Sequence, residues 1–168
     1  MTTWKDFAAA EPELADRARS LLTCTLNGVL GTIRADGSPR LSGIDPFFFD
    51  DEPWIGSMPG ARKGDDLKRD ARMVLHGIPW ESRRVRDGVD DAGEADVKVT
   101  GRAVHVTDPD THAAVTGWIR EEQGMESPGP SDLFRIDLDT VVVISVAEDQ
   151  LVIDRWSAAD GRSTVRRS

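Results

Sequence analysis

The chain has 168 residues, a length typical of one domain, and such a domain buries about 70% of its unfolded surface without a metal or disulfide. Its 21 Lys and Arg residues against 30 Asp and Glu residues give a formal net charge of -9, which opposes binding to nucleic acid or to an anionic membrane surface. With 39% hydrophobic and 30% charged residues, the composition excludes a disordered chain and a membrane protein. We therefore expect one soluble domain over residues 1–168.

The sequence also bears on where the protein resides. No apolar run approaches the roughly 20 residues that a membrane-spanning helix needs, and the first fourteen residues lack the basic and apolar regions of a secretion signal. Cys24 has no second cysteine with which to pair and is expected to be a small buried side chain. These features favour a cytoplasmic protein with neither a nucleic-acid nor a membrane partner.

The first part of the chain predicts a helix followed by a meander of strands. Apolar residues over 11–22 recur at a three-four spacing, and Pro12 suits a first helical turn, so a helix is expected there, within a helical N-terminal segment over 1–22. The elements expected next, from their β-branched residues and Gly/Pro turns, are a strand over 23–34 with a kink or turn at Asn27-Gly28, a turn over 35–39, a strand over 40–49, a turn over 50–53 and a short strand over 54–57.

The remainder of the chain predicts two helices among further strands. Asp108 and Pro109 are typical of a helix start, and A-E-D-Q over 147–150 is expected to be a hairpin turn. The elements expected in order are a short helix over 62–70, a strand over 73–80, a charged loop over 81–95, a strand over 96–106 broken at Gly101, a helix over 108–122, strands over 133–138, 141–146 and 151–156, and a polar tail over 157–168. Six or more mostly antiparallel strands with three short helices indicate an α+β barrel or sandwich.

The common catalytic and metal-binding motifs are missing from the sequence. His76, His105 and His112 are scattered, without the short spacing that metal ligands need. There is also no G-x-S-x-G elbow, no P-loop and no G-x-G-x-x-G after a strand, so the hydrolase, nucleotide-triphosphatase and Rossmann interpretations lose their usual support.

One local feature runs against the acidic composition. Basic residues concentrate at the start of the predicted helix over 62–70, directly after a strand that ends in Ser57. A helix N-terminus attracts an anion through its free N–H groups, and adjacent Arg62 and Lys63 add charged donors. The alternative is a solvated basic face compensated by Asp65 and Asp66, together with Asp70. The residues alone leave both interpretations open.

Three segments in order carry a family resemblance. The run G-T-I-R-A-D-G-S-P-R over 31–40, the run W-I-G-S-M-P-G-A-R-K-G-D-D-L-K-R-D-A-R-M-V-L over 54–75, and V-K-V-T-G-R-A-V-H-V over 97–106 resemble the pyridoxamine 5'-phosphate oxidase-like proteins, an FMN-binding split β-barrel family. The resemblance covers roughly residues 20–156 and looks most like the flavin/deazaflavin oxidoreductase branch. It implies a single-domain α+β split β-barrel that forms a homodimer, with each cofactor in a groove between the two subunits.

The resemblance also implies a set of cofactor-binding residues. In the family's S-R-K-G motif the Arg and Lys hold the flavin phosphate, and this chain has A-R-K-G at that place, with Ala61 in the position of the serine. Trp80 lies where the family often has an aromatic residue near the ring, with core packing as the alternative. The residues carried over are Arg62 and Lys63 for the phosphate, Ser57 and its neighbour Gly56 on the preceding strand, the strand Arg40, Leu41, Ser42, Gly43 and Ile44 beside the isoalloxazine ring, and Trp80.

The function that the resemblance implies is an oxidoreductase that uses FMN, or alternatively a deazaflavin coenzyme, to reduce or oxidise a small organic substrate. The R-L-H-type motif with which the true oxidase grips pyridoxamine phosphate has no histidine counterpart after Trp156, so oxidation of pyridoxamine phosphate is not expected. Two alternatives stay open, a flavin- or haem-binding carrier or sensor without turnover and a barrel that serves only as a dimerisation scaffold.

Overall fold

Nine strands and four helices make up the part of the chain that the computed structural model describes, which comprises residues 2–24, 27–77, 95–124 and 131–168. The helices are α1 (Trp4–Ala10), α2 (Pro12–Thr23), α3 (Arg62–Arg69) and α4 (Pro109–Gln123). The strands are β1 (Gly28–Ile33), β2 (Pro39–Ile44), β3 (Phe47–Phe49), β4 (Glu52–Ser57), β5 (Arg72–His76), β6 (Ala95–His105), β7 (Asp132–Ala147), β8 (Gln150–Ser157) and β9 (Gly161–Arg167).

All strands belong to one sheet, and every pairing in it is antiparallel. The order is β2-β1-β5-β6-β7-β4-β3, and β8 pairs with β7 and with β9. The predicted α+β class with mostly antiparallel strands is confirmed, and the arrangement is consistent with a split β-barrel. No helix within the described residues is long and apolar enough to cross a membrane.

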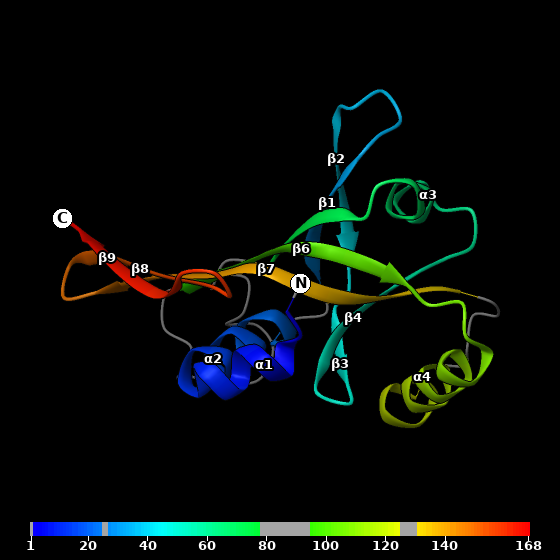
Figure 1. Cartoon of the computed structure of the whole chain (residues 1–168), viewed down its shortest axis with the longest axis horizontal. Coiled ribbons are helices and arrows are strands. Elements are labelled where there is room, and N and C mark those ends of the chain that lie inside the picture. Colours follow the sequence, from blue (N-terminus) through cyan, green and yellow to red (C-terminus); the bar gives the residue numbers. More distant parts are fainter. Residues whose placement is uncertain (1, 25–26, 78–94, 125–130) are drawn as a thin grey trace.

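The two N-terminal helices cover one face of the sheet (Figure 1). Helix α1 begins with a capping box between Thr3 and Asp6, and Pro12 occupies the first turn of α2, as expected. The apolar face predicted for the helix over 11–22 is confirmed, because all five of its members are buried in the main core: Leu14, Ala15, Ala18, Leu21 and Leu22. A second apolar cluster, which includes Phe47, Trp54 and Leu133 of the sheet, packs against Val115 of α4.

Strand β7 corrects the prediction of two separate strands over 133–138 and 141–146. These residues form one strand, which pairs with β6 along most of its length, with β4 in its first part and with β8 in its second part. The ladder between β6 and β7 absorbs a register shift at Thr100/Gly101, where the break was expected. A Cβ at Gly101 would collide with the carbonyl oxygen of Asp137, so only glycine fits there.

Several further boundaries differ from the prediction. The strand expected over 23–34 begins only at Gly28, because α2 continues to Thr23, and β4 begins at Glu52, within the turn expected over 50–53. The strand expected over 40–49 divides into β2 and β3, because Asp45 and Pro46 leave the ladder between them. The polar tail expected over 157–168 includes strand β9, which pairs with β8 and extends with it away from the helices towards the C-terminus (Figure 1). The hairpin turn expected over 147–150 is confirmed, with positive φ at Glu148 and Asp149. The loop expected over 81–95 lies almost entirely outside the described residues.

Candidate anion-binding site

Helix α3 lies beside the β1–β2 hairpin and connects β4 to β5 (Figure 1). It begins at Arg62, as predicted. Ala61 at the N-cap has no side-chain acceptor, so no N-cap side chain accepts a hydrogen bond from the backbone N–H groups of the first turn. Leu67 is buried in the main core and fixes the inner side of the helix. Its charged side is thereby turned towards the hairpin and the solvent.

Lys63 joins the start of α3 to β2. Its Nζ donates a hydrogen bond of 2.7 Å to the carbonyl oxygen of Gly43, 20 residues earlier in the chain. Of the β2 residues predicted to lie beside a flavin ring, Leu41 and Gly43 are exposed, Arg40 and Ser42 are partly buried, and the fifth, Ile44, is buried in the core. The structure therefore brings the predicted phosphate-binding lysine next to the predicted ring-binding strand.

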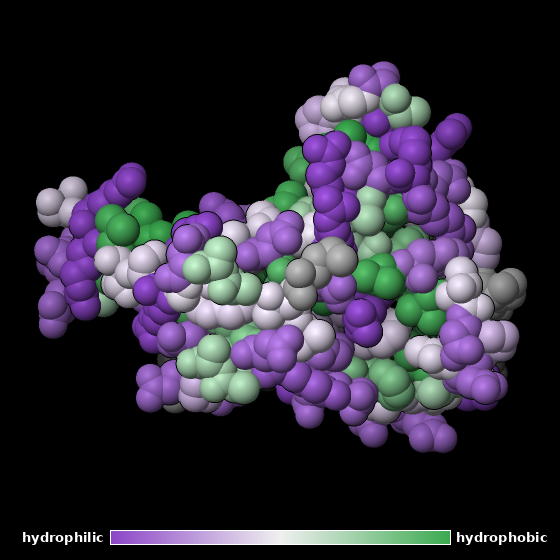
Figure 2. Space-filling model, in the orientation of Figure 1, coloured by the Kyte–Doolittle hydropathy of each residue, from purple (hydrophilic) through white to green (hydrophobic). Residues whose placement is uncertain are grey.

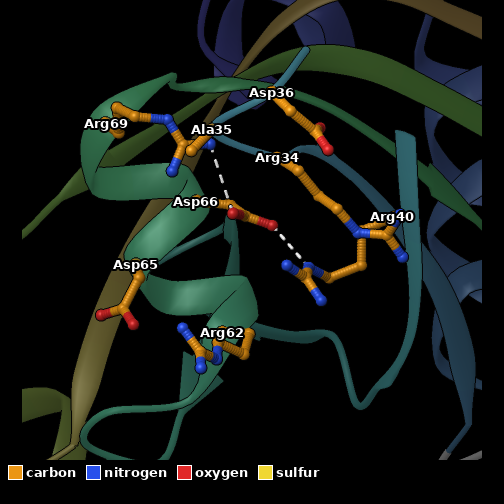
Figure 3. A pocket seen from close by; sticks show the side chains of 8 residues that line it. All are labelled: Arg34, Ala35, Asp36, Arg40, Arg62, Asp65, Asp66 and Arg69. Atoms are coloured by element: carbon orange, nitrogen blue, oxygen red, sulfur yellow. Dashed lines mark hydrogen bonds and ion pairs between the residues drawn. The ribbon is translucent and has the colours of Figure 1, made fainter. Parts of the chain in front are cut away.

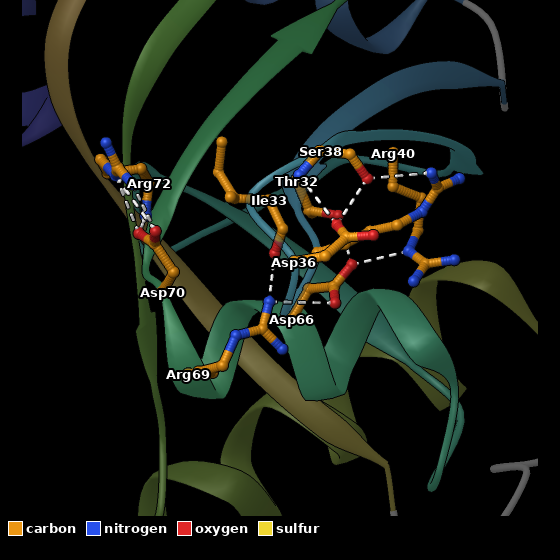
Figure 4. Close-up of polar contacts among 10 residues, drawn as sticks. Thr32, Ile33, Asp36, Ser38, Arg40, Asp66, Arg69, Asp70 and Arg72 are labelled. Atoms are coloured by element: carbon orange, nitrogen blue, oxygen red, sulfur yellow. Dashed lines mark hydrogen bonds and ion pairs between the residues drawn. The ribbon is translucent and has the colours of Figure 1, made fainter.

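Asp66 connects α3 to both strands of the hairpin (Figure 4). Its carboxylate is 3% exposed and accepts hydrogen bonds from Arg40 Nε at 2.6 Å, Thr32 Oγ1 at 2.9 Å and Arg69 Nη2 at 3.2 Å. Burial alone would raise the pKa of Asp66, but these donors outweigh it, so the pKa lies below its usual value. The carboxylate is ionised and holds two arginines in place at neutral pH.

A cavity of about 300 Å³ lies between the hairpin and the charged side of α3 (Figure 3). Its lining carries four guanidinium groups and three carboxylates, in a region where hydrophilic residues dominate the surface (Figure 2). The lining residues are Arg34, Ala35, Asp36, Arg40, Arg62, Asp65, Asp66 and Arg69. Arg40 and Arg62 are the two predicted site residues that meet in this cavity.

Gly56 and Ser57 lie on the other side of α3. They end β4, opposite Leu133 and Asp132 of β7, and Ser57 is buried. A Cβ placed on Gly64 would be 3.1 Å from both Ser57 Oγ and Asp132 Oδ2, so the helix passes directly over this pair. The structure thus places Ser57 beneath α3 and does not make it part of the cavity lining. Trp80 lies outside the described residues.

The contacts of α3 decide between the two interpretations of its basic residues. Most of the cations are compensated: Lys68 pairs with Asp132 at 2.6 Å, Arg69 with Asp66 at 3.2 Å and Arg72 with Asp70 at 2.6 Å. Among the described residues, Arg62 has neither an ion pair nor a hydrogen bond, and Lys63 contacts only a neutral carbonyl group. The solvated and compensated face therefore describes the C-terminal part of the helix, whereas Arg62 and Lys63 in the first turn have no carboxylate partner among the described residues.

Some contributors were not expected from the sequence. Thr32 and Arg34, on β1 and at its end, contribute to the Asp66 network and to the cavity, respectively. The one sequence signal that could have pointed to them is the run G-T-I-R-A-D-G, which contains both residues and precedes β2. Within the described ranges, no group of His, Cys, Asp and Glu could hold a metal ion.

Comparison with known proteins shows to which family the chain is similar. The family model of pyridoxamine 5'-phosphate oxidase matches residues 14–145, most of the chain. A comparison with proteins of curated function found no match.

Solved structures show the same fold at low identity. An FMN-binding, pyridoxamine 5'-phosphate oxidase-related protein from Nostoc punctiforme PCC 73102 superposes with a TM-score of 0.59 at 13% identity, covering 96% of this chain and 97% of that one. A putative pyridoxamine 5'-phosphate oxidase from Listeria innocua gives 0.55 at 18% identity, covering 76% and 95%.

A haem-binding protein from Mycobacterium smegmatis is also similar, with a TM-score of 0.62 at 17% identity. The match covers 86% of this chain but spans only 57% of the M. smegmatis protein. Because the family model matches well over half of the sequence and the fold agrees with these structures, the chain belongs to the pyridoxamine 5'-phosphate oxidase family.

Proposed function

We propose that the protein binds FMN and transfers hydride or electrons between FMN and a small organic substrate. The observation that carries this proposal is the pair of cations in the first turn of α3. Arg62 has no partner among the described residues, and Lys63 reaches the backbone of β2 at Gly43. A phosphate placed there would gain the helix N-terminus and two charged donors in one position.

The residues present fit the two ends of such a cofactor. Arg62 and Lys63 would hold the phosphate at the start of α3. Gly43 has open space where a side chain would project, so a flat ring can approach the backbone of β2 there. When bound, FMN supplies the hydride chemistry itself, and the chain needs only to hold the ring and leave one face open to a substrate.

A carrier or sensor without turnover is the second candidate. It is favoured by the likeness to the haem-binding protein from M. smegmatis and by a cavity lining that carries arginines and aspartates but no histidine to act as a catalytic acid or base. A deazaflavin coenzyme is the alternative cofactor for the enzyme, since its phosphate would use the same cations. Oxidation of pyridoxamine phosphate itself is not part of the proposal.

We further propose that the active form is a homodimer in which each chain supplies half of the cofactor groove. The support is an exposed apolar strip on the face of β2, β1 and β5. Leu41 is 74% exposed, and it lies opposite Gly31, which in turn lies opposite the exposed Val74; Val29 is exposed two residues before Gly31 on the same face. Apolar side chains in contiguous register are typical of a surface that a partner covers.

The test is a spectrum and a titration of the purified protein. We expect the visible bands of a bound flavin, or micromolar binding of added FMN, and weaker binding of riboflavin, which lacks the phosphate. Binding of neither FMN nor a deazaflavin coenzyme at micromolar concentration contradicts the proposal. A flavin that NAD(P)H reduces, or an acceptor re-oxidises, no faster than free flavin would favour the carrier over the enzyme.

A further inference from the structure

The cavity between the β1–β2 hairpin and α3 includes Arg62, one of the two cations assigned to the flavin phosphate, and extends beyond it. Its lining residues on α3 are Arg62, Asp65, Asp66 and Arg69, of which Arg62, Asp66 and Arg69 recur at i, i+4 and i+7 and form one face of the helix. At 1.5 Å per residue this face is about 10 Å long. One phosphate at the start of the helix therefore leaves the far part of the cavity open.

Two of the three carboxylates in the lining are engaged by other groups, and the third, Asp65, has no side-chain partner among the described residues. Asp66 is saturated by Arg40, Thr32 and Arg69. Asp36 accepts hydrogen bonds from Ser38 Oγ at 2.6 Å and from Ser38 N at 2.9 Å, and these two bonds lower the pKa of Asp36. Asp66 and Asp36 are thus engaged within the protein, although the charge of Arg34 also acts on Asp36. The lining as a whole carries four guanidinium groups against three carboxylates.

Two guanidinium groups keep donors for a ligand. Within the described part of the chain, the side chain of Arg34 makes one hydrogen bond, of 3.3 Å from its Nη1 to Ser38 Oγ, and it projects from the hairpin towards Arg40 (Figure 3). Asp66 engages Arg40 through Nε, so the two Nη groups of Arg40 have no partner in the described part of the chain. Asp66 acts here as a positioning residue, because it fixes the direction of Arg40 without closing the cavity.

We propose that this cavity binds a second anionic group, a phosphate or a carboxylate, through Arg34 and Arg40. The inference rests on the proposed function, in which Arg62 and Lys63 hold the first phosphate. Its volume of about 300 Å³ is at the lower end of small-molecule sites and exceeds the space that a lone oxyanion needs. The second anion belongs either to the tail of the cofactor, as in a flavin with a diphosphate, or to a separate anionic substrate.

The test uses Arg34→Gln, which removes the charge from an exposed hairpin residue and retains the backbone hydrogen bond from Arg34 N to Ser38 O. The control is Arg155→Gln, a partly exposed arginine on β8 that pairs with Asp160. Binding of FMN and of FAD is measured by fluorescence titration, and binding of inorganic pyrophosphate by calorimetry, with and without FMN. We expect Arg34→Gln to weaken about tenfold either the binding of FAD or the binding of pyrophosphate to the FMN-loaded protein, as the loss of a charge-assisted bond does. The binding of FMN alone should change less than twofold.

The arms separate the two sources of the anion. Weaker FAD binding in Arg34→Gln assigns the cavity to a cofactor tail, whereas weaker pyrophosphate binding to the FMN-loaded protein assigns it to a separate substrate. Unchanged values in both arms, or equal losses in Arg155→Gln, overturn the inference. If no flavin binds at all, the proposed function fails. The inference is then tested by pyrophosphate binding to the protein without flavin: weaker binding in Arg34→Gln supports it, and unchanged binding overturns it.

Discussion

Arg40 Nε and Asp66 Oδ2 lie 2.6 Å apart, although 26 residues separate them along the chain. Asp66 is buried and Arg40 is about one quarter exposed, so this ion pair is better shielded from solvent than the others of α3. It ties the middle of α3 to β2, and the bonds from Thr32 and Arg69 complete the connection. Both the position of the helix and the direction of Arg40 depend on this carboxylate.

The variant Asp66→Asn should therefore destabilise the protein. The amide keeps the shape of the side chain, but it leaves Arg40 and Arg69 without their shared counter-charge. We expect a loss of about 2–3 kcal/mol in the free energy of unfolding, less than for a fully buried pair because both arginines are partly exposed. Urea unfolding measures it, with Asp50→Asn as the control, since the exposed Lys5–Asp50 pair should contribute about 1 kcal/mol or less. Equal losses in the two variants would refute the structural role of Asp66.

The same carboxylate predicts how stability depends on pH. Because the pKa of Asp66 is lower in the folded protein than its usual value of 3.8, the unfolded chain binds the proton more readily. Its contribution is therefore complete above the unfolded value and is lost as the pH falls through the lower, folded value. Unfolding of wild type and Asp66→Asn between pH 7 and pH 2 should show a constant difference above about pH 5 that shrinks below about pH 4. If the difference in the free energy of unfolding between the two proteins grew on acidification, the lowered pKa of Asp66 would be contradicted.

Gly101 tests the register shift between β6 and β7. An added methyl group would meet the carbonyl oxygen of Asp137, which is backbone and cannot move aside like a side chain. We expect Gly101→Ala to cost at least about 2 kcal/mol in the free energy of unfolding. Gly117→Ala in α4 is the matched control, because nothing lies within 4 Å of its Cβ, and alanine there should stabilise the helix by about 0.5–1 kcal/mol. Similar effects of the two substitutions would argue against this register.

The apolar strip on β2, β1 and β5 tests the proposed homodimer. Val74→Glu places a charge next to Leu41 and Val29 on this face, and a buried unpaired charge is costly. Light scattering coupled to gel filtration should give the dimer mass for the wild type and the monomer mass for Val74→Glu. The control is Ala9→Glu, at an exposed position of α1, which should leave the dimer intact. A dimer that survives Val74→Glu would place the interface elsewhere.

The sequence predicted the elements whose causes are local. Helix α2 follows from its apolar spacing and Pro12, and the turn after β7 from the polar run A-E-D-Q, in which Asp149 tolerates positive φ. Strand β9 was missed because all of its residues are exposed and show no alternation; it is held by pairing with β8 and by bonds from Arg162 and Thr164 to Asp154. Those contacts join separate strands, so no local sequence pattern predicts them.

The candidate site likewise contains residues that the sequence predicted and residues that only the folded structure shows. The position of Arg62 and Lys63 at a helix start after a strand left two interpretations open, and the resemblance to the family's S-R-K-G motif assigned them to the phosphate. The structure leaves both without a carboxylate partner among the described residues. Asp66 was expected only to compensate cations of its own helix, as it does for Arg69, and its contacts with the hairpin were not predicted. Only the folded chain places Thr32 and Arg40 against it, and only the folded chain shows that Ser57 lies beneath α3.

The most direct test of the central claim is the affinity for FMN of the double variant Arg62→Ala, Lys63→Ala. We predict that it binds FMN about 30-fold or more weakly than the wild type, because two charge-assisted contacts worth about 2–5 kcal/mol are lost. Riboflavin, which has no phosphate, should bind both proteins equally, and the control Lys5→Ala, Arg19→Ala, which removes two exposed cations that pair with Asp50 and Asp51, should bind FMN as the wild type does. An unchanged FMN affinity in the folded Arg62→Ala, Lys63→Ala variant would contradict the phosphate site and the function proposed from it.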